Sequence, residues 1–409
     1  MKRADTFWQG VILFLVFCVT LGIYALLAVA ARPLLGRGRN DGPATGQDNA
    51  VQIVAPLPGT VVQRSSEIPV RAVVVEPGAL RAELHIDSQL LAAEANPDPE
   101  AVPWTVAFVW QEAGEGTHSL GVQALGPEGE LVTSASVTLT VVPAGALAFA
   151  SNRDGAYALY TMQTDGTGLA RLTTGPGDVR QPAWGPAGQL AFVAEGEAGR
   201  VSIGQLGVSG GQVETLAAGR DPAWSPDGAW LAYTASVEGI SQVFVADAEG
   251  DEARSLTAEM IYAGQPASSP DGARVVYVAE RAGNLDIWVV GADGGEPVRL
   301  TDDPATDWAP AWSPDGTRLA FVSDRGGSHQ LYAMRADGSQ VEALTDLAQG
   351  AEAPAWSPDG YWLAFVAYTG QGTGVNAREI YLVRADGREL VRLTHNAFDD
   401  TEPDWAAVP

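Results

Sequence analysis

The sequence predicts an all-β protein in which a six-bladed β-propeller follows a smaller β-sandwich and one N-terminal transmembrane helix. Three observations support this prediction. A motif close to Pro-Ala-Trp-Ser-Pro-Asp-Gly recurs through the last two thirds of the 409 residues, a different β-like pattern precedes it, and a long uncharged run lies near the N-terminus. A repeat of roughly 40 to 50 residues is typical of propeller blades.

Six copies of the motif set the period of the propeller. The tryptophan position of the copies is occupied by Trp184, Trp224, Ser268, Trp312, Trp356 and Trp405. Successive positions are 40, 44, 44, 44 and 49 residues apart. The tryptophans recur in phase, so we expect each to fill the same gap between neighbouring blades. The extra length before the last copy is an insertion around 372–377, whose Gly-rich letters precede a strand rather than the helix that a dinucleotide site needs.

Each copy contains four pieces with a local physical reason. In residues 313–316, Ser-Pro-Asp-Gly combines the fixed φ of proline with a glycine that tolerates positive φ, which predicts a tight turn. The apolar run 318–323 is too short for a helix and suits a buried strand. A third run, 330–338, ends in Asp-Gly, and a fourth ends in Leu344-Thr345. Four short strands in each unit make one blade.

The strand count predicts how the ring closes. The first apolar strand, at 147, has no Pro-Ala-Trp strand before it, and the last Pro-Ala-Trp-like strand, at 402, has no apolar strand after it. Residues 402–409 should therefore supply the innermost strand of the blade formed by 146–174. This closure leaves no unpaired blade edge in the circle.

The full pattern, which runs from Pro-x-Trp-Ser-Pro-Asp-Gly through Leu-Ala-Phe-Val-Ser to Leu-Tyr-x-Met and Asp-Gly, resembles the TolB-type propeller repeats. These are similar to WD repeats and also occur beside prolyl-oligopeptidase-like peptidase domains. The resemblance covers 146–409 and implies a six-bladed propeller. It implies little about activity, because propellers host many unrelated functions.

The N-terminal segment 1–31 is interpreted as a membrane anchor. Residues 11–31 carry no charge and are long enough to span a bilayer as a helix. The alternative is a cleaved signal peptide, since Ala28-Val29-Ala30 fits a small-x-small cleavage site. Positive charges flank the run on both sides and do not settle its orientation. The similarity to extracytoplasmic modules favours a single-pass cell-membrane protein whose C-terminal domains lie in the periplasm or at the cell surface.

A linker and a second domain precede the repeats. Residues 32–49 are rich in Gly, Pro and polar residues and predict a flexible linker. Residues 50–143 contain strand-like runs separated by turn clusters, which predicts a β-sandwich with immunoglobulin-like topology. Residues 114–129 resemble the late strands of bacterial Ig-like modules. Cys18 is the only cysteine, so packing alone must hold the two sheets.

The charge of the chain excludes some partners. The whole sequence has 24 basic and 50 acidic residues, and the part after residue 40 keeps 19 arginines and 49 acids, a net charge of −30. Such a field repels nucleic acid and anionic lipid surfaces. Lys2 is the only lysine, so the soluble part has none for Schiff-base chemistry.

No catalytic constellation emerges from the sequence. The single Gly-x-Ser-x-Gly, at 207–211, falls where the other blades carry a turn, whereas a nucleophile elbow needs a strand and a helix. The four histidines are scattered and show no zinc-ligand spacing. No cofactor is expected. Two loops carry oxygen ligands of the type that calcium prefers, but without EF-hand spacing, and solvated loop acids in a strongly acidic chain are the favoured interpretation. The acids of these loops are Asp302, Asp303 and Asp307 in one, and Asp399, Asp400 and Glu402 in the other.

The most variable segments of the repeats predict the binding face. The turns are nearly uniform between blades, but the connections that lead into the Pro-Ala-Trp strands differ, and variable loops on a rigid ring are where recognition usually lies. The predicted binding residues at the channel mouth are Arg180, Gln181, Arg220, Asp221, Gln265, Asp307, Trp308, Glu352, Asp400 and Glu402. Trp308 lies outside the repeated position and is either an exposed aromatic anchor or packed against a neighbouring loop.

Three functions remain open at this stage. The favoured one is a membrane-tethered binding or scaffold protein whose propeller loop face meets a protein, a peptide or a glycan. The second is a propeller enzyme, a metal-assisted lyase or hydrolase, that acts at the channel mouth. The third is an architectural component of the cell envelope.

Overall fold

The computed structural model describes residues 50–65, 67–100, 102–175, 177–196, 199–207, 213–257, 262–281, 283–369 and 377–406. The described residues are strands, turns and loops, and they contain no helix long and apolar enough to cross a membrane. The predicted anchor and linker, 1–49, lie outside them, as do most of the Gly-x-Ser-x-Gly segment and the insertion at 370–376. The predicted all-β fold is confirmed.

Eight strands before residue 143 form two sheets around a common core. One sheet has the order β1 (Val51–Ala55), β3 (Glu67–Val74), β6 (Trp104–Gln111). The other has the order β2 (Thr60–Gln63), β8 (Leu131–Val142), β7 (Gly116–Leu125), β4 (Arg81–Ile86), β5 (Gln89–Ala95). Every second residue of β6 is buried, as expected for a strand with one face on the core. The likeness to immunoglobulin-like modules stays a prediction.

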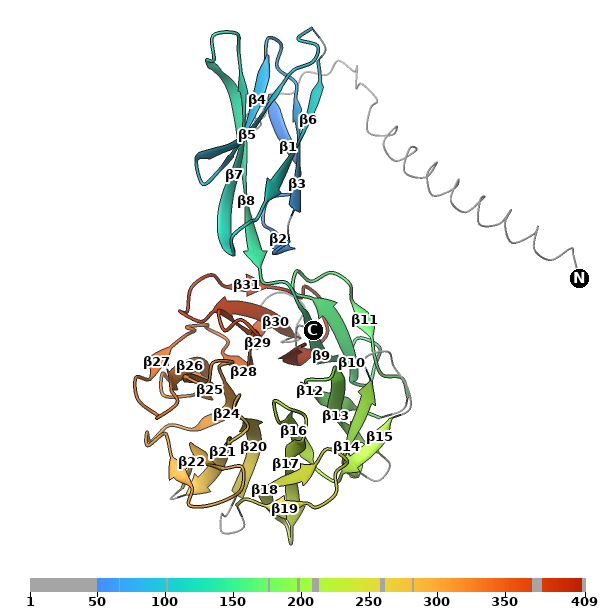
Figure 1. Ribbon diagram of the computed structural model, residues 1–409, viewed down its shortest axis with the longest axis vertical. Coiled ribbons are helices and arrows are strands. Elements are labelled where there is room, and N and C mark those ends of the chain that lie inside the picture. The colour runs from blue at the N-terminus through green and yellow to red at the C-terminus, as the bar shows by residue number, and fades with distance from the viewer. Residues whose placement is uncertain are drawn as a thin grey trace, which may run out of the picture. The chain divides into compact units, whose positions relative to one another are not determined.

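Six four-stranded sheets follow, and Figure 1 shows them arranged as the blades of a ring around a common centre. We number the blades in chain order. The second blade comprises β12 (Val179–Trp184), β13 (Gln189–Glu195), β14 (Val201–Gly207) and β15 (Glu214–Ala217). The third comprises β16 (Arg220–Trp224), β17 (Trp230–Val237), β18 (Ile240–Asp247) and β19 (Arg254–Ser255). The fourth comprises β20 (Tyr262–Ser268), β21 (Arg274–Arg281), β22 (Asn284–Gly291) and β23 (Val298–Arg299).

The last two blades have the same antiparallel order. The fifth comprises β24 (Asp307–Trp312), β25 (Arg318–Ser323), β26 (Gln330–Arg335) and β27 (Glu342–Ala343). The sixth comprises β28 (Ala351–Trp356), β29 (Trp362–Thr369), β30 (Ala377–Arg384) and β31 (Val391–Arg392). The outermost strands are only two to four residues long in these five blades. Short outer edges limit pairing with other chains.

The first blade is built from both ends of the repeat region. It comprises β9 (Ala146–Ser151), β10 (Ala158–Gln163), β11 (Ala170–Arg171) and β32 (Asp400–Trp405). The C-terminal β32 is innermost and pairs antiparallel with β9, with Asp400 opposite Ser151 and Trp405 opposite Leu147. The strand begins two residues earlier than the sequence motif indicates. We call the β32–β9 pairing the seam, because hydrogen bonds rather than the chain join its two sides.

The repeated motif residues have local hydrogen-bonding roles. In the turn of the fifth blade, the Ser313 hydroxyl donates to Asp315 at 2.6 Å and the Thr317 amide donates to the same carboxylate at 3.0 Å. These hydrogen bonds lower the pKa of Asp315. The threonine of each Leu-Thr pair accepts from the third strand, as Thr345 does from the Leu331 amide at 2.9 Å. These bonds explain why the polar residues recur between apolar strands.

Tryptophans of the inner strands lie between blades, as their phase predicts. The Trp356 Nε1 atom donates to the Ala311 carbonyl of the fifth blade at 3.1 Å, and Trp405 Nε1 donates to Ala355 of the sixth at 2.9 Å. Each neighbouring pair of blades shares a cluster of buried apolar side chains. The blade interfaces therefore form the core of the propeller.

Candidate functional site

All six inner strands bend at the same point. Pairing with the second strand shifts register there, so that two inner-strand residues face one partner residue. This is a β-bulge. The first bulge residue of each strand has φ of 51 to 55°: Gln181, Asp221, Gln265, Ala309, Ala353 and Glu402. Proline follows each of them, and positive φ is uncommon for these residue types. The bulges bring six equivalent side chains to one end of the channel.

Side chains at the bulges bind the neighbouring blade. A Glu402 carboxylate oxygen accepts a hydrogen bond from the backbone amide of Gln181 at 2.9 Å, and Gln181 Oε1 accepts one from the backbone amide of Asp221 at 3.0 Å. Gln181 Nε2 also donates to Asp221 Oδ1 at 2.6 Å, and Gln265 Oε1 accepts from the Ala309 amide at 2.9 Å. These polar side chains therefore fix the geometry of the bulges as well as line the channel.

The bulges surround a cavity that we call the mouth cavity. Its volume is about 300 Å³, and a second cavity of about 330 Å³ shares several of its lining residues and extends along the channel. These volumes lie at the lower end of the range for small-ligand sites. The mouth cavity is lined by Gln181, Asp221, Pro222, Gln265, Pro266, Trp308, Ala309, Pro310, Glu352, Ala353, Pro354, Arg378, Thr401 and Glu402. All six blades thus contribute to a single site.

The backbone around the mouth repeats six times, but the side chains do not. Four neighbouring blades place a polar bulge residue there, and the fifth and sixth place Ala309 and Ala353. Next to these alanines lie Trp308 and Glu352. The mouth therefore has one side of carboxylates and amides and another side with an indole and room for a ligand.

Strand β32 adds a second carboxylate deeper in the channel. Asp404 occupies the position that is alanine in the other five inner strands, and its Oδ2 accepts from the Trp184 amide at 2.7 Å. Burial raises the pKa of Asp404 to about 6 and also raises the pKa of Glu402. The ion pairs of the described residues include neither of these carboxylates, nor Asp221. The channel wall is thus acidic on this side.

Six of the ten predicted binding residues line the mouth cavity: Gln181, Asp221, Gln265, Trp308, Glu352 and Glu402. Two others are arginines outside its lining. Arg220 is exposed, and the guanidinium carbon of Arg180 lies 3.2 Å from the centre of the Tyr157 ring.

The prediction that Asp307 and Asp400 line the mouth needs correction. Both are fully buried in the blades, where Arg325 binds Asp307 at 2.9 Å and Arg153 binds Asp400 at 2.8 Å. An inward-facing carboxylate needs such a partner because burial of an unpaired charge is costly. Each aspartate lies in an inner strand, and this position suggested that it faces the mouth. Its arginine partner follows the apolar second strand of the same blade and binds the carboxylate inside the blade.

Trp308 is half-buried and takes part in both predicted arrangements. Its ring packs edge-on against His329, with ring centroids 4.7 Å apart and an angle of 86° between the ring planes. It also lines the mouth cavity. The nearby Glu352 lies 3.4 Å from both His329 Nδ1 and the Tyr368 hydroxyl. These weak contacts leave Glu352 available to a ligand.

Sequence reasoning missed two channel residues, Arg378 and Asp404. Arg378 reaches the mouth from β30 and lies 3.6 Å from Asp399, and no repeat position distinguishes it. The sequence does distinguish Asp404, because alignment of the six inner strands shows an aspartate where the other five have alanine.

The loop acids considered as calcium ligands have other partners in the structure. Arg299 binds Asp302 at 2.5 Å, while Asp307 and Asp400 lie in the buried ion pairs above. Among the described residues, no group of three or more His, Cys, Asp or Glu side chains is arranged to hold a metal.

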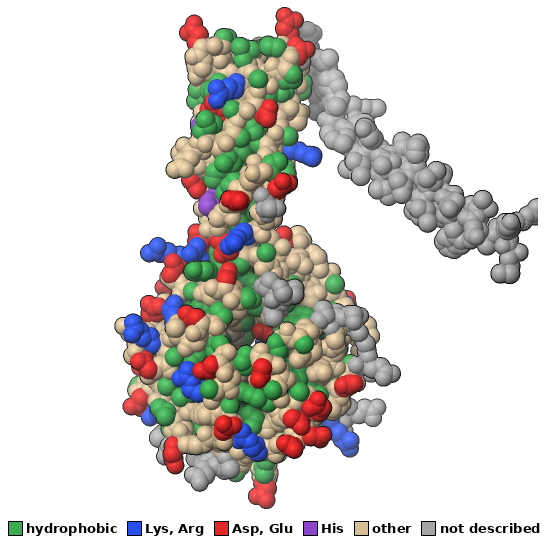
Figure 2. Space-filling view, in the orientation of Figure 1, with side chains coloured by type: hydrophobic (Ala, Val, Ile, Leu, Met, Phe, Trp, Pro, Cys, Tyr) green, Lys and Arg blue, Asp and Glu red, His purple; other side chains and the backbone are tan. Residues whose placement is uncertain are grey.

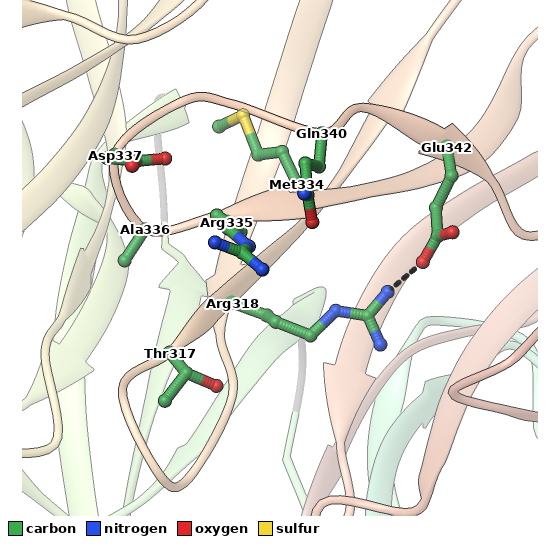
Figure 3. A pocket seen from close by; sticks show the side chains of 8 residues that line it. All are labelled: Thr317, Arg318, Met334, Arg335, Ala336, Asp337, Gln340 and Glu342. Carbon is green, nitrogen blue, oxygen red and sulfur yellow. Dashed lines mark hydrogen bonds and ion pairs between the residues drawn. The ribbon is translucent and has the colours of Figure 1, made fainter.

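A larger cavity of about 660 Å³ lies away from the channel, between strands of the fifth blade. Figure 3 shows Arg318 extended across it toward Glu342. Arg318 also donates to the Ala385 carbonyl at 3.1 Å. This arginine already joins two blades, so the channel mouth is the better candidate site. Acidic and basic side chains are scattered over the propeller face visible in Figure 2 rather than gathered in one patch.

Comparison with known proteins shows similarity to TolB propellers over part of the chain. Residues 219–371 match the family model described as TolB beta propeller domain. The structure of TolB from Acinetobacter baumannii is similar, with 21% identity, 72% of this chain and 80% of that chain covered, and a TM-score of 0.58. For a putative TolB from Agrobacterium tumefaciens the values are 26%, 62%, 90% and 0.51. A chain of a nidogen/laminin complex gives 14%, 64%, 98% and 0.52. No curated protein matches the chain.

Proposed function

We propose that this TolB-type propeller is the recognition domain of a membrane-tethered, extracytoplasmic binding protein. Its channel mouth would receive part of a protein, peptide or glycan partner. The observation that carries the proposal is the mouth cavity itself, which all six blades line with one repeated backbone and different side chains. A rigid frame with varied side chains suits selective binding.

The lining indicates the chemistry of the partner. Asp221, Glu352 and Glu402 offer hydrogen-bond acceptors, and Trp308 offers an apolar surface. The side-chain amides of Gln181 and Gln265 already make hydrogen bonds to neighbouring blades. A partner with hydrogen-bond donors beside an apolar group is complementary to this lining. The net charge of −30 after residue 40 disfavours nucleic acid.

Site-specific photo-crosslinking in cells tests the mouth as the binding site. A crosslinking amino acid at position 352 should yield a defined adduct, and Trp308→Ala should remove that adduct because it deletes the apolar wall beside it. The control is the same amino acid at Val341, which is exposed and away from the mouth. Equal adducts from both positions, or adducts unaffected by Trp308→Ala, would contradict the proposal. No adduct from position 352 would favour the architectural alternative.

The tether is tested separately. The uncharged run 11–31 supports an anchor, and the similarity to TolB propellers supports export. A C-terminal alkaline phosphatase fusion of the full chain should therefore be active. A C-terminal fluorescent protein that folds only in the cytoplasm should stay dark. The reverse pattern would place the propeller in the cytoplasm. Cleavage near Ala30 with release of the protein from the membrane would show that residues 11–31 are a signal peptide and not an anchor.

A further inference from the structure

The seam is the one place in the ring where a blade is completed without chain continuity. Opening the ring there separates β9 from β32, which belong to the same blade but lie more than 240 residues apart in sequence. Strand β9 continues from the sandwich, whereas β32 continues from the sixth blade. A contact between the sandwich and the sixth blade must therefore break before the seam can open widely.

The sandwich is held on the first-blade side by a short connection and a side chain. Only three residues separate β8 from β9. At the end of β2, Gln63 Nε2 donates to the Gly145 carbonyl at 2.6 Å and to the Thr164 hydroxyl at 2.8 Å. Gly145 precedes β9 and Thr164 follows β10, so Gln63 binds both ends of that hairpin.

The sandwich also binds the sixth blade, on the other side of the seam. Trp362 at the start of β29 is fully buried, and its Nε1 atom donates to Glu115 of the sandwich at 3.0 Å. Glu389, after the turn that follows β30, accepts from the amide of Thr117 in β7 at 3.1 Å. Arg64 pairs with Glu115 at 3.3 Å and Arg384 with Glu389 at 3.6 Å.

Apolar packing joins the same three parts. The buried cluster between the sixth and first blades contains Leu147, Trp362 and Trp405, and it also contains Val142 from the last sandwich strand. Val61 of β2 packs against it. The five other clusters between blades contain no sandwich residue among those described. The sandwich thus contributes to the core of one blade interface, the one beside the seam.

The third blade provides an internal comparison. Trp230 and Glu252 occupy the positions of Trp362 and Glu389, and Glu252 has the same backbone φ of 53° as Glu389. Trp230 is half-buried rather than fully buried, and Glu252 is exposed. The third blade thus has the same pair of residue types, but in the described structure it is the pair in the sixth blade, next to the seam, that binds the sandwich.

We infer that the sandwich is a clamp that holds the propeller ring closed across its seam, in addition to any role as a spacer. It is bound covalently to the β9 side and non-covalently to the side that carries β32. Both hydrogen bonds between the sandwich and the sixth blade in the described part of the chain use residues next to the Ser-Pro-Asp-Gly and Asp-Gly turns, and no sandwich residue lines the mouth cavity.

Hydrogen exchange of the full-length protein in detergent tests the clamp. The variant Glu115→Ala/Glu389→Ala removes two acceptors that join the sandwich to the sixth blade. Amides of β32 and β9 should then exchange about five-fold faster for each hydrogen bond lost, because each bond contributes roughly a factor of five to closure. The inner strands β16 and β20, on the far side of the ring, should keep their exchange rates.

The matched control is Glu112→Ala/Glu252→Ala, which removes one exposed acid from each module without a described contact between them. It should leave exchange at the seam unchanged. Equal rates for β32 in the two double variants would overturn the inference, and so would equal acceleration of all six inner strands. If the first variant does not fold, Glu389→Ala alone, which removes the acceptor for Thr117 together with the ion pair to Arg384 and leaves Glu115 in place, must still accelerate β32 selectively.

Discussion

A chain that ends at Asp399 is expected to lose the cooperative unfolding of its propeller. The deletion removes β32 and with it the pairing to β9, the buried Trp405 and the ion pair between Arg153 and Asp400. Removing one large buried aromatic side chain alone costs on the order of 3 to 5 kcal/mol. The net stability of a domain is only about 5 to 15 kcal/mol, so the loss of a whole inner strand should consume most of it.

The measurement is thermal unfolding followed by near-ultraviolet circular dichroism, with a chain that ends at Ala406 as control. The control keeps all of β32 and should melt as the full chain does. The chain that ends at Asp399 should show a broad transition at much lower temperature, and a strong tendency to aggregate through the exposed edge of β9. Equal melting of the two chains would mean that the seam does not stabilise the ring.

Replacement of Asp404 by Asn is expected to stabilise the protein at neutral pH and not at acid pH. Burial raises the pKa of Asp404 to about 6 in the folded state, from an ordinary value of 3.8. The folded state therefore binds the proton more tightly than the unfolded state does. The contribution of this carboxyl to stability is greatest below pH 4, falls as the pH rises from about 4 to 6, and stays low above that.

The size of the effect follows from the shift. A shift of about two pKa units corresponds to about 3 kcal/mol, and partial access of water to Asp404 reduces the expected gain to roughly 1 to 2 kcal/mol at pH 7.5. Asparagine keeps an oxygen that accepts from the Trp184 amide, as Asp404 does at 2.7 Å. The free energies of unfolding of variant and parent, measured by urea denaturation between pH 4 and 8, should begin to diverge near pH 4 and reach a constant difference above about pH 6.

Asp404→Ala separates the charge from the hydrogen bond. Alanine is the residue of the other five inner strands at this position, but here it leaves the Trp184 amide without this acceptor. We expect a loss of about 1 to 3 kcal/mol at acid pH, because an unsatisfied buried donor costs that much. A pH-independent difference between Asp404→Asn and the parent would show that the carboxyl is not the titrating group.

The repeat made the propeller predictable. Strands, turns and blade number depend on local signals, such as the proline and glycine of Ser313 to Gly316, that recur six times in register. The return of the last strand followed from counting, because an incomplete unit at each end leaves one solution. The gathering of the polar bulge residues at the mouth was predictable as well, because six inner strands with the same repeat must place equivalent positions around the channel.

The direction in which individual carboxylates face could not be read in the same way. Asp307 and Asp400 lie at the start of inner strands, like the mouth residues, but each binds an arginine that follows the second strand of its blade, and each is buried there. The raised pKa of Asp404 depends on its burial in the folded protein, and the docking of the sandwich depends on the hydrogen bond from Trp362 to Glu115. The repeated local pattern determines the ring and its mouth. Which side chains are free to bind, and what holds the seam, depends on contacts between residues far apart in the chain, and these exist only after the blades and the sandwich have packed.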